Sequence, residues 1–84
     1  MNREEILVVI DKHLVKAVDE VAPGQMNPED RFTDYGATSL DIVEIVSGAM
    51  RELKIKIPRP ELAEIQNING LVDKLLQYAK PKES

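Results

Sequence analysis

A short polar stretch near the middle of the chain places a serine where its hydroxyl could carry a covalently attached group. Residues 36–41 read GATSLD. Thr38 and Asp41 have the three-residue spacing of a capping box, in a variant that ends in Asp rather than the more usual Glu or Gln. If Thr38 caps a helix there, Ser39 takes the first helical position and its hydroxyl can point to solvent. The four free backbone amides and the positive end of the helix dipole would then favour a phosphate attached to Ser39.

The same residues allow a plainer interpretation, in which Ser39 itself is the helix cap. Serine is among the preferred residues at helix starts, and most such serines only cap. Spacing alone therefore does not establish an attachment site.

Other residues that could carry chemistry lack partners in the sequence. His13 is the only histidine, and we expect it to be a solvated side chain of the first helix. Asp41 and Glu44 are three residues apart and are expected to be exposed, so they are not expected to act as an acid–base pair. The sequence contains no cysteine, which excludes disulfides and cysteine-ligated metals. We predict no catalytic residue, no metal site and no enzymatic activity.

Length and charge narrow the class of protein. The 84 residues are enough for one domain, which we expect to span residues 1–84 with a polar tail from about residue 81. The formal net charge of −4 argues against nucleic acid as a partner and favours proteins with basic patches. The first residues do not have the pattern of a signal peptide, and no segment is long and apolar enough to span a membrane. We therefore expect a cytoplasmic protein, and we expect it to be monomeric.

Apolar residues recur at helical spacing in three long segments, with a shorter helical turn between the second and the third. The predicted helices cover about residues 3–20, 39–53, 60–64 and 68–79. The long connection 21–37 is rich in Pro, Gly and acidic residues, and we expect Met26, Phe32 and Tyr35 to anchor it. Gly48 costs about 1 kcal/mol relative to Ala in a helix interior, so the close approach of another helix is its simplest explanation. The predicted fold class is all-α, a four-helix bundle of three main helices and a short third helix.

The chain resembles the acyl carrier proteins over nearly its whole length. The hallmark of that family is Asp-Ser-Leu, often within Gly-Ala/Val-Asp-Ser-Leu-Asp, and residues 36–41 match it except at Thr38. Residues 43–44 (VE) and the apolar run after them match the family's second helix. Residues 57–58 (IP) match an Ile-Pro pair that commonly precedes its short third helix. The resemblance implies that Ser39 carries a 4′-phosphopantetheine arm, derived from coenzyme A, whose thiol holds an acyl group as a thioester.

The resemblance also implies roles for the residues around Ser39. Three of them would lie on the face that docks partner enzymes: Leu40, Asp41 and Glu44. Four others could line a space between helices that shelters the acyl chain: Val43, Val46, Leu62 and Ile65. The partners would be a phosphopantetheinyl transferase and acyl-loading, elongating or acyl-transfer enzymes of fatty acid, lipid or polyketide-type biosynthesis.

Two departures from the family's pattern point to a specialised member. Thr38 stands where Asp is usual, which removes one negative charge beside Ser39. A carrier for fatty acid synthesis typically has a heavily acidic second helix, whereas here the end of that helix and the residues after it are mixed or basic. The basic residues are Arg51, Lys54, Lys56 and Arg59. Two alternatives stay open: a carrier of aminoacyl or peptidyl groups, and a cofactor-free helical adaptor that binds a partner through its second helix.

Overall fold

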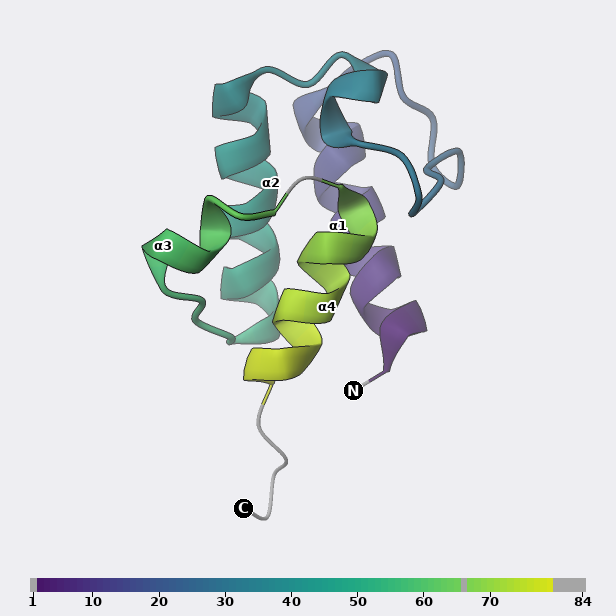
Figure 1. The fold of residues 1–84 in the computed structure, drawn as a ribbon. Helices are drawn as coiled ribbons and strands as arrows, with labels where there is room; N and C mark the ends of the chain where they lie inside the picture. The colour runs from purple at the N-terminus through teal and green to yellow at the C-terminus, as the bar shows by residue number, and fades with distance from the viewer. Residues whose placement is uncertain (1, 66, 80–84) are drawn as a thin grey trace.

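The computed structural model describes residues 2–65 and 67–79, and this part of the chain is helical with no strands. The elements in chain order are α1 (Arg3–Ala17), the 3₁₀ turn η1 (Phe32–Tyr35), α2 (Ser39–Leu53), α3 (Arg59–Leu62) and α4 (Ile68–Tyr78). Helix α1 packs against both α2 and α4, and α3 lies to the outer side of α2 (Figure 1). This arrangement confirms the predicted all-α bundle with a short third helix. The polar tail expected from about residue 81 lies outside the described residues.

Side-chain caps fix where the three long helices begin. The Asn2 side chain accepts a hydrogen bond from the Glu5 amide at 2.8 Å, and the Glu5 carboxylate accepts one from the Asn2 amide at 3.1 Å. The Asn67 side chain accepts one from the Gly70 amide at 2.7 Å. Each cap satisfies amides that have no partner inside the helix, and so favours a start at that residue. Helix α2 begins and ends at the predicted residues.

Helix α1 ends at Ala17, before the predicted end at residue 20. Val18 is extended, with φ −125° and ψ 105°, although its N–H still bonds the Leu14 carbonyl. Val18 and Val21 are both buried in the core, at 9% and 7% exposure. Valine loses side-chain freedom in a helix and favours extended backbone, so burying both valines outside the helix ends α1 early.

The core is mostly aliphatic, and the three long helices supply its most deeply buried side chains. Its most deeply buried side chains are Ile6, Ile10, Leu14, Ile45, Ile68, Leu71, Val72 and Leu75. Burial of a side chain of this size contributes roughly 1.5–3 kcal/mol, which is the main force holding the helices in this arrangement. Among the described residues, no helix is long and apolar enough to cross a membrane.

Helices α1 and α2 approach closely at Gly48. A Cβ atom built at Gly48 would lie 2.5 Å from Nδ1 of His13, closer than any side chain tolerates. The structure thus confirms the close approach expected from a glycine in the middle of this helix. It also corrects the expectation for His13, whose side chain is only 17% exposed and lies 3.0 Å from the Glu52 carboxylate. Because Gly48 has no side chain, the imidazole fits between the two helices.

The long connection before α2 is pinned at both its aromatic residues. Phe32 is buried, at 2% exposure. The Tyr35 hydroxyl donates to the Asp30 carboxylate at 2.8 Å and accepts from the Asn27 amide at 2.6 Å. Backbone bonds then join this connection to the start of α4, from the Ile68 amide to the Asp30 carbonyl at 3.0 Å. Met26 is half-buried against the core. These contacts fix the loop that leads directly into residue 36 and the start of α2.

Candidate functional site

Gly36 turns the chain from η1 into α2. Its φ of 87° lies in the left-handed region, where glycine has no steric penalty. The Gly36 amide bonds the Thr33 carbonyl at 3.0 Å, which closes the turn. Ala37 is then buried at 5% exposure, so the residue just before the helix is held against the core. The first turn of α2 is therefore fixed in position from the loop side.

Thr38, not Ser39, caps helix α2. The Thr38 hydroxyl accepts a hydrogen bond from the Asp41 amide at 3.1 Å, and the Asp41 carboxylate accepts one from the Thr38 amide at 2.9 Å. The capping box predicted from the spacing is therefore formed, and Ser39 is the first residue of the helix. This resolves the two interpretations that the sequence left open.

Ser39 is exposed, and its hydroxyl has no hydrogen-bond partner within the described part of the chain. The capping box uses two of the four amides at the helix start, those of Thr38 and Asp41. The Ser39 and Leu40 amides remain, and they point out of the positive end of the helix dipole. A phosphodiester on Ser39 fits this environment, because its negative charge would lie beside two free amides. The cap itself is already complete with the Asp41 carboxylate.

An exposed apolar surface follows Ser39 along α2. Leu40 is 77% exposed and Val43 is 59% exposed, both high for large apolar side chains. Glu44 is exposed on the same part of the helix, and Asp41 is half-buried by its role in the cap. The three residues expected to contact partners thus lie within the first two turns after Ser39.

A groove of about 790 Å³ runs between α2 and α3. Its lining residues are Val43, Ser47, Met50, Lys56, Ile57, Arg59 and Leu62. Of the four residues expected to line an acyl space, the structure places Val43 and Leu62 in this groove. Val46 belongs instead to the core at 7% exposure, and Ile65 is half-buried against the core. The sequence missed Met50 and Ile57 as lining residues, although their apolar character and helical or extended register could have identified them.

The far wall of the groove is braced by an ion cluster between α3 and α4. The Lys74 ammonium lies 2.6 Å from the Glu61 carboxylate, and the Tyr78 hydroxyl donates to the same carboxylate. The hydrogen bond from Lys74, followed by that from Tyr78, lowers the pKa of Glu61. The hydrogen bond to Glu61 raises the pKa of both Lys74 and Tyr78. Because α3 has only four residues, this cluster adds to the packing of Leu62 against the core in holding α3 to α4.

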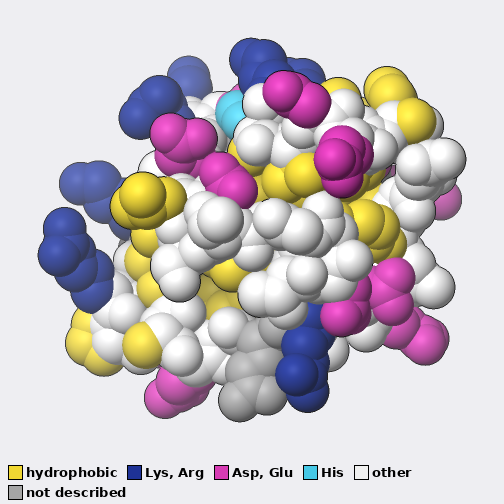
Figure 2. All heavy atoms as spheres, turned by 90° about the horizontal axis from the view of Figure 1, so that it is seen from above, with side chains coloured by type: hydrophobic (Ala, Val, Ile, Leu, Met, Phe, Trp, Pro, Cys, Tyr) yellow, Lys and Arg dark blue, Asp and Glu magenta, His cyan; other side chains and the backbone are white. Residues whose placement is uncertain are grey.

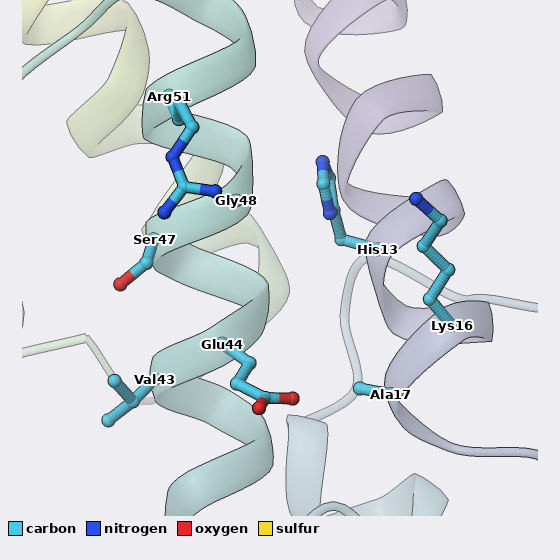
Figure 3. Close-up of a pocket in the computed structure, with 8 residues that line it drawn as sticks. All are labelled: His13, Lys16, Ala17, Val43, Glu44, Ser47, Gly48 and Arg51. Carbon is cyan, nitrogen blue, oxygen red and sulfur yellow. The ribbon is translucent and has the colours of Figure 1, made fainter.

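A second hollow, of about 430 Å³, lies between α1 and α2 (Figure 3). His13, Lys16 and Ala17 border it from α1, and residues 43–51 of α2 border it from the other side. In Figure 3 the His13 ring points from α1 toward Gly48 on α2, which is the close approach described above. Among the described residues that line this hollow, no hydrogen bond joins a nucleophile to a base. Across the described residues, no group of three His, Cys, Asp or Glu side chains could hold a metal ion.

Comparison with known proteins agrees with this geometry. The family model for the phosphopantetheine attachment site matches residues 12–75 of the chain. The chain is 32% identical over 75 residues to the polyketide biosynthesis acyl-carrier-protein AcpK of Bacillus subtilis, covering 89% of this chain and 92% of that protein. It is 39% identical over 81 residues to an acyl carrier protein of Cyanidioschyzon merolae, covering 95% of this chain and 88% of the relative.

A solved structure is similar in both fold and sequence. The structure is described as that of the curacin biosynthetic pathway HMG synthase in complex with acetyl donor-ACP. The matched chain superposes with a TM-score of 0.79 at 34% identity, over 95% of this chain and 100% of that one. Proteins of this family carry acyl groups on a phosphopantetheine arm rather than catalyse reactions themselves. With an exposed serine opening α2 and a family model that spans most of the bundle, the chain belongs to the acyl carrier proteins.

Proposed function

We propose that Ser39 is the phosphopantetheine attachment point, and that this carrier serves a specialised, polyketide-type pathway rather than housekeeping fatty acid synthesis. The observation that carries the proposal is the free Ser39 hydroxyl at the first position of α2, left available because Thr38 does the capping. The serine oxygen would become the ester oxygen of the arm's phosphodiester. The arm would supply the thiol that this cysteine-free chain lacks.

The residues around Ser39 have distinct tasks in this proposal. Leu40 and Val43 offer apolar contact to a docked enzyme, and such exposed apolar groups are typical of binding surfaces. Asp41 and Glu44 give the same surface negative charge, which attracts the basic surface of a phosphopantetheinyl transferase. The groove between α2 and α3 can receive the acyl end of the arm against Val43 and Leu62.

Two findings support a specialised pathway. The relative AcpK is a polyketide carrier, and the similar solved chain is an acetyl donor to an HMG synthase. The end of α2 and the residues after it are also mixed or basic rather than acidic, which weakens recognition by enzymes that bind an acidic helix. We therefore infer that the chain presents short acyl groups such as acetyl to an HMG-synthase-type or related acyl-transfer enzyme. We expect it to work as a monomer in the cytoplasm, where coenzyme A supplies the arm.

The pathway can be tested by competition between enzymes. In one assay, the chain loaded with an acetyl-phosphopantetheine arm is offered to an HMG synthase of the curacin type. In the other, malonyl transfer to the unacylated holo chain is measured with a generic malonyl transferase and ketoacyl synthase. We expect acetyl transfer to the HMG synthase and poor use by the generic pair, relative to a standard fatty acid carrier. Equal use of both carriers by the generic enzymes would refute the specialised role while leaving the attachment at Ser39 standing.

A further inference from the structure

Four positive side chains gather within nine residues at the end of α2 and the connector that follows it. They are Arg51, Lys54, Lys56 and Arg59, and all four are exposed. We call them the basic patch. The chain as a whole has a net charge of −4, so this cluster is a positively charged region on a negatively charged protein. Figure 2 shows Lys and Arg side chains projecting along one side of the molecule, beside exposed hydrophobic groups.

The patch is not used for ion pairs within the described residues. Arg3, Lys12 and Lys74 each bond a carboxylate, at 2.7, 2.5 and 2.6 Å. No patch residue has such a bond within residues 2–65 and 67–79. The one acidic residue in the same stretch, Glu52, already bonds Lys12 and lies beside His13. The four charges are therefore available to an outside partner.

Stabilisation of α2 explains only part of the patch. Arg51 and Lys54 lie at the C-terminal end of the helix, where positive charge interacts favourably with the dipole. Lys56 lies in the extended connector, and Arg59 is the first residue of α3, so neither gains from the negative end of a helix. Two of the four charges thus have no role in stabilising the helices.

Lys54 has a backbone conformation that is uncommon for a residue with a side chain. It has φ 59° and ψ 42°, and is the one non-glycine residue with positive φ among those described. Glycine usually occupies this position after a helix because other residues are strained there. Here the left-handed residue closes the end of α2, where the Ile55 amide bonds the Met50 carbonyl at 2.9 Å. The left-handed turn also directs the chain into the connector that carries Lys56.

We propose that the basic patch is a second docking surface, which binds an acidic surface on the acyl-processing enzyme that receives the arm. The identity of the partner as such an enzyme rests on the proposed carrier function. Lys54 is fifteen residues beyond Ser39, which corresponds to about 22 Å along a helix. Charge along α2 therefore changes from negative beside Ser39 to positive at the far end. A partner with basic residues near its active-site entrance and acidic residues about 20 Å away would be held in one orientation, with the arm directed inward.

An acidic protein surface fits the patch better than a membrane or nucleic acid. Glu44 and Glu61 lie on the helices that flank the patch and Glu64 lies in the turn after α3, so an extended polyanion would meet these carboxylates as well. A protein surface can match a local change of sign, whereas a uniformly negative surface cannot. The exposed apolar residue Val43 and the half-buried Met50 adjoin the patch in the same groove, and could add apolar contact at the protein interface.

The first test uses the unmodified chain, so it does not depend on attachment at Ser39. Amide NMR signals are followed while a short peptide with two or three glutamates, small enough to cover the patch alone, is added at low salt. We expect the amide signals of residues 51–59 to shift most. These shifts should be absent in the variant Lys56→Glu/Arg59→Glu. They should be retained in Lys16→Glu/Arg31→Glu, a control that changes the net charge by the same amount outside the patch. Shifts spread evenly over the molecule, or none at the patch, would overturn the proposal. So would stronger binding of phosphatidylglycerol vesicles at these residues, which would indicate a membrane surface instead.

The second test measures docking by the rate of acyl transfer. The acetylated holo chain is given to an enzyme that accepts it, and kcat/KM is measured at several salt concentrations. We expect Lys56→Glu/Arg59→Glu to lower kcat/KM about tenfold or more at low salt, with little change in kcat and with the loss shrinking as salt rises. Lys54→Gly should relieve the left-handed strain and keep the fold, yet still lower kcat/KM. Unchanged kcat/KM in both variants would show that the patch does not dock the enzyme, even where Ser39 is modified normally.

Discussion

At the scale of single residues, Thr38 caps α2 and Ser39 is left available for attachment. A serine that capped α2 would have its hydroxyl held by a backbone amide and would be poorly placed for modification. Because Thr38 forms the reciprocal bonds with Asp41, Ser39 keeps its hydroxyl and two neighbouring amides free. The residue type that departs from the family's pattern therefore preserves the geometry on which the attachment depends.

Thr38→Ala removes the cap and should destabilise the protein by about 1 kcal/mol. Thr38→Asp retains a capping oxygen and adds a negative charge at the positive end of the helix, so its stability should equal or slightly exceed that of the wild type. Urea unfolding measures both effects, and Thr38→Ser is the conservative control. We also expect Thr38→Asp to be modified faster by a broad-specificity phosphopantetheinyl transferase. A stable Thr38→Ala variant would show that α2 does not depend on this cap.

Gly48→Ala tests the close approach of α1 and α2. The methyl group gains about 1 kcal/mol of helix propensity, but it would lie 2.5 Å from the His13 ring. We expect the steric cost to win, because moving the ring also breaks its contact with Glu52, giving a net loss of about 1–2 kcal/mol. His13→Ala/Gly48→Ala should recover most of that loss in thermal unfolding. An additive loss in the double variant would contradict the contact.

At the scale of elements, the sequence predicted the helix that carries the site better than its surroundings. The bounds of α2 follow from a recognisable cap at Thr38 and a regular apolar period, both local signals. The early end of α1 depends on burial of Val18 and Val21 against residues distant in sequence, which no local pattern reveals. The half-buried position of His13 likewise depends on which helix lies opposite it. Local chemistry therefore predicted the start of α2 and the place of Ser39 in it, whereas tertiary packing decided the end of α1 and the burial of His13.

The groove between α2 and α3 was predicted only in part, for the same reason. Val43 and Val46 are three residues apart on one helix, and the sequence predicts that both line the acyl space. In the structure Val43 is exposed at the groove and Val46 is in the core. Which side of a largely apolar helix faces the core depends on the placement of α1 and α4. The bracing of α3 by Glu61 and Lys74, thirteen residues apart, was also invisible to the sequence patterns.

The bracing of α3 predicts a pH dependence. Hydrogen bonds from Lys74 and Tyr78 hold the pKa of Glu61 below its ordinary value of 4.5. The carboxylate therefore adds stability in full above pH 4.5, and that contribution is lost as pH falls through the lower pKa of the folded state. Glu61→Gln should be less stable than the wild type at neutral pH, and the difference should vanish in acid. Thermal unfolding of both proteins between neutral and acidic pH measures this, with Glu64→Gln as a control whose carboxylate lies farther from Lys74, at 3.8 Å. A difference that persisted unchanged into acid would contradict the role of the charge.

At the scale of the whole molecule, the fold presents Ser39, the proposed attachment residue, on a small and firmly held surface. The aliphatic core and the pinned loop fix the first turn of α2, while Leu40 and Val43 stay exposed beside Ser39. Because the chain belongs to a family of carriers, its function is to bring an attached acyl group to other enzymes. A carrier must also leave each enzyme, which favours docking by exposed charges and a few apolar contacts over a large buried interface.

The central claim is that Ser39 carries the arm, and intact-mass measurement tests it most directly. The purified chain is incubated with coenzyme A and a broad-specificity phosphopantetheinyl transferase, alongside Ser39→Ala and the matched control Ser47→Ala, which changes another serine of the same helix. We predict the mass gain of one phosphopantetheine on the wild type and on Ser47→Ala, and none on Ser39→Ala. A mass gain on Ser39→Ala would contradict the account. So would the absence of a gain on a wild-type chain that circular dichroism shows to be folded, even with a transferase that tolerates Thr38.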